Sequence, residues 1–231
     1  MIVFDPRVHC YKNELTNEEY ISATTLLNKY KKPFDRDNIA KKVAAKENVS
    51  VESVLAKWEK INSASKTQGT KIHEAIELFN KDKTVTEEFS DIIENYANLG
   101  VISDKDDLLV EEKVYNHNYR VAGTVDIIRN ESKGSFSIFD IKTNKKFNFF
   151  NAYNEMLLYP LNHLSNCEYS LYSLQLSLYA YMYQQLTGRR VNTLGIIYCD
   201  VPNKSFNYYP ANYLKTDIIN ILEHYAKSKL G

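Results

Sequence analysis

The pattern of hydrophobic and polar positions divides the chain into a mostly helical first part and a later part that contains several strands. Between residues 35 and 98, apolar side chains recur every three or four positions, as they do in amphipathic helices. The segments 107–116, 119–130 and 134–144 instead alternate between apolar and polar residues and are rich in β-branched and aromatic side chains. We expect these three segments to form consecutive antiparallel strands.

The remaining segments complete a mixed α/β pattern. Short strands are expected within residues 1–22, helices at 23–30, 35–48, 50–61, 65–83, 86–98, 168–188 and 213–230, and further strands at 192–201 and 204–210. Strands followed by a helix and another strand predict a central mixed β-sheet flanked by helices. Gly188 is expected to end the helix before it. We expect one compact domain, in which an N-terminal strand and helical layer (residues 1–68) packs on a core (residues 69–231).

The composition is that of an ordinary globular protein. Hydrophobic residues make up 44% of the 231 residues and charged residues 25%. The formal net charge is zero, which argues against a strongly basic nucleic-acid binder, although the acids of a catalytic centre would offset a basic groove. No secretory signal and no apolar run of membrane-spanning length is visible, so we expect a cytoplasmic protein without a membrane partner.

The three cysteines, Cys10, Cys167 and Cys199, lie far apart in the sequence and form no CxxC pair. Their number and spacing indicate neither a disulfide framework nor a zinc ribbon. We expect buried free thiols in a reducing compartment.

Charged side chains interrupt two of the predicted strands. Asp126 lies in one strand, and Asp140 and Lys142 lie two positions apart in the next, so these last two share a face. If the strands pair around the turn between them, the two aspartates come close together and repel each other unless a cation lies between them. Mg²⁺ suits such oxygen ligands, and Glu111 or Glu112 on the preceding strand can supply a third carboxylate.

Taken alone, an Asp-x-Lys sequence is more often a solvated ion pair that contributes less than about 1 kcal/mol to stability. Here the apolar neighbours Ile138, Phe139 and Ile141 indicate a buried strand, and buried charges need partners or a metal. A lysine beside a metal-bound carboxylate pair can orient or deprotonate a water and stabilise a pentacovalent phosphate. The pattern therefore favours phosphodiester hydrolysis.

Four short motifs follow one another along the chain: G-x-x-x-H-x-x-x-E, G-x-x-D, D-x-K and Q-x-x-x-Y, on a predicted helix, strand, strand and helix. They consist of Gly69, His73, Glu77, Gly123, Asp126, Asp140, Lys142, Gln175 and Tyr179. This order resembles the PD-(D/E)XK nuclease superfamily, and more narrowly its RecB-like and phage-type exonuclease branch, which includes mitochondrial genome-maintenance exonucleases. The resemblance implies a restriction-endonuclease-like α/β core.

The resemblance also implies a role for each matching residue. The metal ligands for Mg²⁺ or Mn²⁺ would be Asp126 and Asp140, with the carbonyl of Ile141, His73 and Glu111 as further ligands; the spacing in this branch favours Glu111 over Glu112. Lys142 would be the catalytic lysine. Gln175 and Tyr179 would contact DNA or hold Lys142 and the water. Some members of the branch hold an iron–sulfur cluster through four cysteines, and with three ungrouped cysteines we expect no such cluster here.

Several of these residues also have an ordinary structural explanation. A single histidine on an amphipathic helix, such as His73, is more often packed or exposed than a ligand, and Glu77 one turn later is more often solvated or a partner of a ligand. Gln175 can satisfy a neighbouring backbone group, and the tyrosines of its helix, including Tyr172, are mostly packing residues. For DNA, Lys145 and Lys146 at the exit of the Lys142 strand are the best candidates to hold phosphates.

Together these observations predict a metal-dependent DNA exonuclease that acts in recombination, repair or phage DNA processing, in a bacterium or a phage-infected cell. Its partners would be DNA ends or single-stranded DNA, and a recombination or helicase protein. The alternatives are a catalytically silent DNA-end-binding or assembly module on the same fold, and a structure-specific or RNA-directed endonuclease. The long connection from residue 144 to 168 is expected to close over the substrate or to form a wall of a DNA channel.

Overall fold

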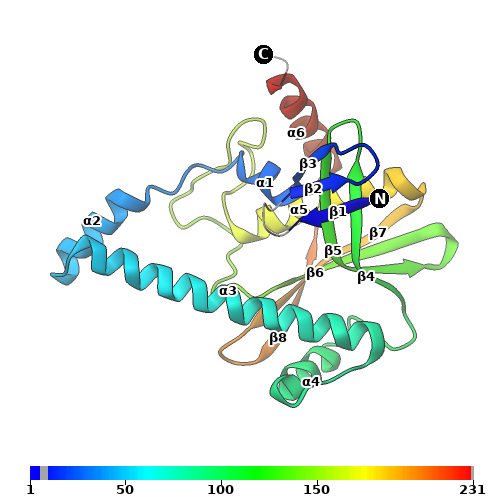
Figure 1. Ribbon diagram of the computed structural model, residues 1–231, viewed down its shortest axis with the longest axis horizontal. Coiled ribbons are helices and arrows are strands. Elements are labelled where there is room, and N and C mark those ends of the chain that lie inside the picture. The colour runs from blue at the N-terminus through cyan, green and yellow to red at the C-terminus, as the bar shows by residue number, and fades with distance from the viewer. Residues whose placement is uncertain (6–9, 230–231) are drawn as a thin grey trace.

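The protein folds around one mixed β-sheet with helices on both faces, as the sequence predicts (Figure 1). The structure, a computed structural model, describes residues 1–5 and 10–229. The strands are β1 (Ile2–Asp5), β2 (Cys10–Asn13), β3 (Glu19–Ser22), β4 (Asp107–Asn116), β5 (Val121–Glu131), β6 (Ser135–Lys142), β7 (Arg190–Asp200) and β8 (Ser205–Ala211). The strand order is β1-β2-β3-β5-β6-β7-β8, and β4 pairs with β5. The three predicted consecutive strands are β4, β5 and β6, and they are antiparallel.

The sheet divides along one side of β5. At its start, β5 pairs in parallel with β3 at Val121 and Ala122, and at its end it pairs with β6 from Ile127 onwards. Between these two contacts, residues 123–125 pair only with β4 among the described strands, and Asp126 has no ladder partner among them. The backbone therefore opens at the middle of a central strand, and Asp126 lies at the edge of this opening.

Six α-helices of the described chain surround the sheet: α1 (Ala23–Asn28), α2 (Arg36–Glu47), α3 (Val51–Asp82), α4 (Ser90–Asn98), α5 (Glu168–Thr187) and α6 (Lys215–Ser228). Two 3₁₀ turns, η1 (Glu87–Phe89) and η2 (Ser132–Gly134), complete the regular structure. Helices α1, α5 and α6 pack against one face of the sheet and α3 and α4 against the other, which gives two separate hydrophobic clusters. Within the described residues, no helix is both long enough and apolar enough to cross a membrane.

Helix α5 lies in the larger cluster and is buried on most of its surface, which explains why its sequence has little amphipathic character. The helix ends as predicted: Gly188 adopts a left-handed conformation (φ 70°), and its N–H donates to the carbonyl of Gln184 at 2.9 Å. A left-handed residue of this kind is a common helix terminator, and glycine adopts it without steric strain.

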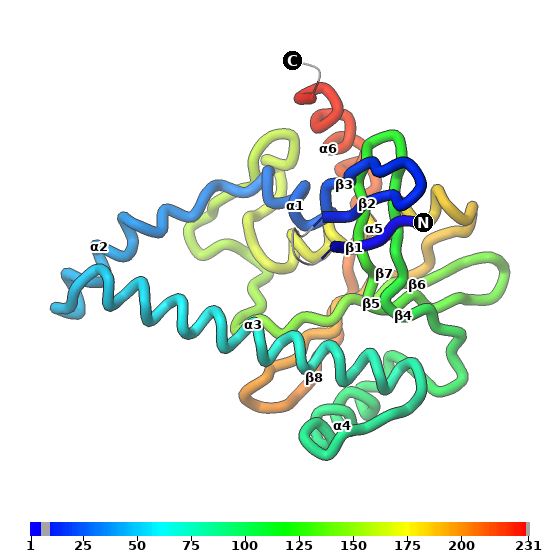
Figure 2. Tube along the Cα trace, in the orientation of Figure 1, coloured from blue at the N-terminus to red at the C-terminus, as the bar shows by residue number. Residues whose placement is uncertain are grey.

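Helix α3 differs from the sequence-based expectation. Two helices were expected, at 50–61 and 65–83, but the structure has one helix of 32 residues, which also runs through the expected layer boundary at residue 68. The intervening polar residues contain no proline, and the first glycine, Gly69, lies in the middle of the helix, so nothing breaks it. Its first half extends beyond the sheet together with α2 (Figures 1 and 2). Every side chain from residue 59 to 68 is exposed.

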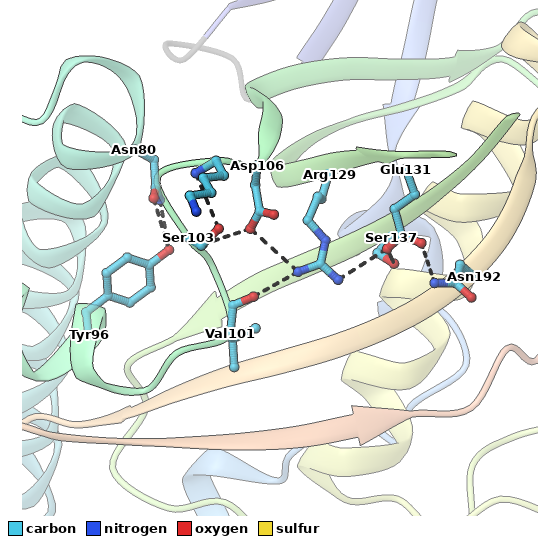
Figure 3. Close-up of polar contacts among 10 residues, drawn as sticks. Asn80, Tyr96, Val101, Ser103, Asp106, Arg129, Glu131, Ser137 and Asn192 are labelled. Carbon is cyan, nitrogen blue, oxygen red and sulfur yellow. Dashed lines mark hydrogen bonds and ion pairs between the residues drawn. The ribbon is translucent and has the colours of Figure 1, made fainter. Parts of the chain in front are cut away.

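A polar network around Arg129 holds the far end of the β5–β6 hairpin (Figure 3). The Arg129 guanidinium donates to the carbonyl of Val101 at 2.9 Å and to Glu131 at 3.2 Å, and it lies 3.7 Å from Asp106. Ser137 also donates to Glu131, at 2.5 Å. The network ties the loop between α4 and β4 to the hairpin that carries Asp126 and Asp140.

Candidate active site

Asp126 takes the place of a missing strand partner. Strand pairing between β5 and β6 stops at Ile127 and Phe139, and just beyond that point the Oδ2 atom of Asp126 accepts a hydrogen bond from the N–H of Ile141 at 2.7 Å. The same oxygen lies 3.6 Å from Nδ1 of His73 on α3. A buried backbone N–H needs an acceptor, and a side-chain carboxylate supplies it here while its second oxygen stays available.

The alternation of side chains reverses at this point in both neighbouring strands. Val125 packs in the cluster beneath α5, but Ile127, two positions later, packs in the cluster beneath α3. On β4 the corresponding residue is Glu111, whose φ of 58° lies in the left-handed region. The register is the same on both sides of Glu111. Strict strand alternation would place Asp126 on one face with Ile128, but Ile128 packs beneath α5 while Asp126 lies beside His73 of α3.

Asp140 and Lys142 share a face of β6, as strand alternation predicts, and they form a buried network with α5. Nζ of Lys142 lies 2.5 Å from Oδ2 of Asp140 and donates to Oε1 of Gln175 at 3.3 Å. The Gln175 amide donates to Oδ1 of Asp140 at 3.2 Å and also contacts the hydroxyl of Tyr179 at 3.0 Å. Asp140 is 2% exposed. Gln175 thus joins the acid and the base of this pair and keeps both oriented.

Tyr172 is part of the site, although its sequence context indicated only packing. The ammonium of Lys142 lies 4.7 Å from the centre of the Tyr172 ring, which is the geometry of a cation–π contact. Tyr172 precedes Gln175 by three positions on α5, so both face the same side of the helix. That spacing was the available signal, but the richness of this helix in tyrosine obscured it.

The structure separates the two candidate acids of β4. Glu111 lines a small cavity together with His73, Asp126 and Ile141. Glu112 instead pairs with Val125 on β5, and its charge acts on Tyr183 of α5. Of the two residues, only Glu111 therefore lies beside Asp126, which agrees with the preference drawn from the motif spacing.

Burial and mutual repulsion make the acids of this site weak. Burial and the nearby Asp140 charge raise the pKa of Asp126 to about 6, while His73, Lys142 and the Ile141 N–H act in the opposite direction. Burial and the charges of Asp126 and Glu77 raise the pKa of Glu111 to about 7, although Lys113 and Lys81 lower it. Carboxylates that repel one another in a buried place form an environment that favours a cation.

The residues present suit a hard divalent cation. The cavity between His73, Glu111 and Asp126 has a volume of about 10 Å³, which is close to the space of one water or ion. In the chain as described, no three His, Cys, Asp or Glu side chains converge closely enough to enclose a metal, because Asp140 is turned towards Lys142 and Gln175. Oδ2 of Asp140 already has the Lys142 ammonium at 2.5 Å as its ion-pair partner, so a metal ion there would share this carboxylate with Lys142. The carboxylate and imidazole donors of these residues are appropriate in chemistry for such a cation.

Two motif glycines allow close contacts around the site. A methyl group at Gly69 would lie 2.6 Å from Oγ1 of Thr143, so this glycine lets α3 approach the end of β6. A methyl group at Gly123 would lie 2.4 Å from Cε1 of Tyr179, whose ring covers the open part of β5. The glycines of the motifs thus have a packing reason in this chain.

We expect Gly123→Ala to lower the free energy of unfolding by about 1–3 kcal/mol, because the buried Tyr179 ring must move. Chemical denaturation followed by circular dichroism measures this change. In a Tyr179→Leu background the same substitution should have a much smaller effect, because the clash is removed. An equal loss in both backgrounds would show that the contact between the two residues does not matter.

The other predicted residues are distributed around this centre. Tyr179 is 4% exposed, so it supports Gln175 from within the core, in place of the DNA contact that the motif suggested. Lys145 and Lys146 are exposed just after β6, and the phosphate contacts predicted for them stay a prediction. Glu77 forms an exposed ion pair with Lys81 at 2.5 Å, which is the ordinary explanation considered for it.

Comparisons with known proteins give only distant likenesses. No family model matches the sequence, and no curated protein matches it. Among solved structures, a Eubacterium rectale protein named "Putative exonuclease" has 10% identity and a TM-score of 0.41, and the match covers 91% of this chain and 80% of that one. A protein named SSO0001 has 13% identity and a TM-score of 0.38, with coverages of 90% and 76%.

Proposed function

We propose that this protein is a divalent-metal-dependent deoxyribonuclease of the PD-(D/E)XK type that hydrolyses phosphodiester bonds from DNA ends. The proposal depends above all on one observation: a buried aspartate, Asp140, and a half-buried aspartate, Asp126, lie on neighbouring strands beside a lysine that is held by Asp140, Gln175 and the ring of Tyr172. Buried structural ion pairs do not need repelling acids next to them, whereas phosphate chemistry does need a cation and a positioned ammonium group.

Each side chain has a defined task in this proposal. Asp126 and Asp140, with Glu111 and His73 nearby, would hold Mg²⁺ or Mn²⁺, and the bound metal would lower the pKa of a water and neutralise charge on the phosphoryl oxygens. Gln175 and Tyr172 hold the Lys142 ammonium in place. Lys142 would then stabilise the negative charge that grows on the phosphate in the transition state. Lys145 and Lys146 would hold phosphates on one side of the scissile bond.

The test is an incubation of end-labelled linear DNA, single-stranded and double-stranded, with Mg²⁺, Mn²⁺ or EDTA. We expect cleavage that requires the metal and releases label from an end, and a covalently closed circle should stay intact. Cutting of the circle would favour the endonuclease alternative. Binding without any cutting in either metal would contradict the proposal and favour a silent DNA-end-binding module.

A further inference from the structure

Three adjoining hollows follow the exposed part of α3 from its N-terminal half to the candidate active site. The first has a volume of about 620 Å³ and lies between Phe34, Trp58 and Lys145. The second, about 340 Å³, shares Ser65 and Lys145 with the first. The third, about 480 Å³, shares Ser65 with both others and reaches His73 and Glu111. Neighbouring hollows share lining residues along α3, and we call this row of hollows the α3 groove.

The helix that lines this groove is otherwise unsupported. Residues 59–68 of α3 are exposed on every side, and the helix extends past the sheet with only α2 packed on its first turns (Figure 2). An isolated polar helix has little stability of its own, and a helix that is polar on all sides can bridge solvent between two packed parts of a protein. Here it connects the active site to an aromatic pair.

Phe34 and Trp58 form that pair at the far end of the groove. Their ring centres lie 6.3 Å apart at 54°, and Phe34 is 68% exposed. Arg36 and Lys145 line the same hollow, and Glu59, which lies 3.7 Å from Arg36, is the one acid among its lining residues. Exposed rings with cations at their edge are the components of a stacking site for nucleic-acid bases.

We propose that the Phe34–Trp58 pair stacks against an unpaired base of a single nucleic-acid strand, and that the α3 groove leads this strand to the active site. Trp58 and His73 are 15 positions apart on one helix, which corresponds to about 22 Å at ~1.5 Å per residue. A stacked strand at ~3.4 Å per nucleotide spans this length with about six nucleotides. This inference rests on the proposed nuclease function and names its substrate: a strand with at least that many unpaired nucleotides.

Only an unpaired base can expose its face to the two rings. In a duplex the bases are stacked on one another, and extracting one costs a few kcal/mol. Base stacking also explains why the groove needs few cations and why a chain with zero formal net charge can bind a polyanion. The α3 groove therefore predicts a preference for single strands over duplexes, which the carboxylates of the candidate active site alone do not predict.

Trp58 is the only tryptophan of the chain, so its fluorescence reports directly on this site. The experiment titrates the full-length protein in EDTA, where no cleavage is expected, with single-stranded oligothymidylate, oligouridylate and a blunt DNA duplex. We expect saturable quenching by the single strands and at least about tenfold weaker binding of the duplex. Phe34→Ala, which keeps the reporter, should weaken single-strand binding about tenfold, whereas Leu15→Ala, a change at another exposed apolar residue, should have no effect.

Several outcomes would overturn this inference. The first is a Trp58 fluorescence that no oligonucleotide changes, and the second is an equal affinity of Phe34→Ala and the unmodified protein for single strands. The third is a fluorescence change that depends on protein concentration without any oligonucleotide, which would show that a second copy of the chain covers the rings. Circular dichroism confirms that the variants are folded. If Mg²⁺ supports cleavage but no oligonucleotide changes the Trp58 fluorescence, this inference fails and the nuclease function stands. If single strands quench Trp58 but no metal supports cleavage, the nuclease function fails and the binding of single strands stands.

Discussion

Lys142→Ala is expected to lower the rate of metal-dependent DNA cleavage by about 10²–10³-fold. The ammonium of Lys142 is the only cation of the described site that both Asp140 and Gln175 hold, and removing one positioned donor to a developing negative charge has effects of about 10²–10³-fold. Its removal also leaves the buried Asp140 carboxylate without its ion-pair partner, so this proposed metal ligand is held less firmly in its orientation.

The rate should be measured on end-labelled DNA at saturating Mg²⁺, with Lys146→Ala as the matched control. Lys146 carries the same charge four positions later, but it is exposed and forms no contact with the two aspartates. We therefore expect the control to change binding slightly and leave the maximal rate within about twofold. Full activity of folded Lys142→Ala, with folding shown by circular dichroism, would rule out this mechanism.

The second large effect is a loss of stability in the metal-free protein as the pH rises from about 4 to about 7. In the folded state the pKa of Asp126 is raised to about 6 and that of Glu111 to about 7, whereas in the unfolded chain both acids titrate near 4. Between these values the folded state binds more protons than the unfolded state, so the free energy of unfolding decreases with increasing pH. For Asp126 alone the loss is on the order of 3 kcal/mol, at ~1.4 kcal/mol per pH unit.

Thermal unfolding in EDTA at pH 5 and pH 8 measures this effect, and a decrease of the midpoint by roughly 10 °C is expected. Glu111→Gln should be less sensitive to pH, because it removes one of the repelling charges. Mg²⁺ or Mn²⁺ added at pH 8 should restore much of the midpoint in the unmodified protein and less in Asp126→Asn. A midpoint of thermal unfolding that rises with pH in EDTA, or that neither Mg²⁺ nor Mn²⁺ changes, would contradict the predicted cation site.

The sequence alone was sufficient for most of the fold. The alternating apolar segments correctly predicted β4, β5 and β6 as consecutive antiparallel strands, and the glycine at 188 ends α5 as expected. These features could be predicted because they depend on residues close together in the chain, namely the period of the side chains and the conformational freedom of glycine. The helix α3 was divided wrongly because a weakly polar segment without a breaker continues a helix that its neighbours have already formed.

The sequence by itself also determined which residue types enter the candidate site, and it paired Asp140 with Lys142 because alternation along one strand places them on one face. Only the tertiary structure decided the rest. The reversal of alternation at Glu111 and Asp126, the selection of Glu111 over Glu112, the burial of Tyr179 and the contact of Lys142 with Tyr172 all depend on elements that are distant in the sequence. The physical reason is that local periodicity describes a regular strand, whereas this site exists where the sheet departs from regularity and α3 and α5 approach the opening from opposite faces.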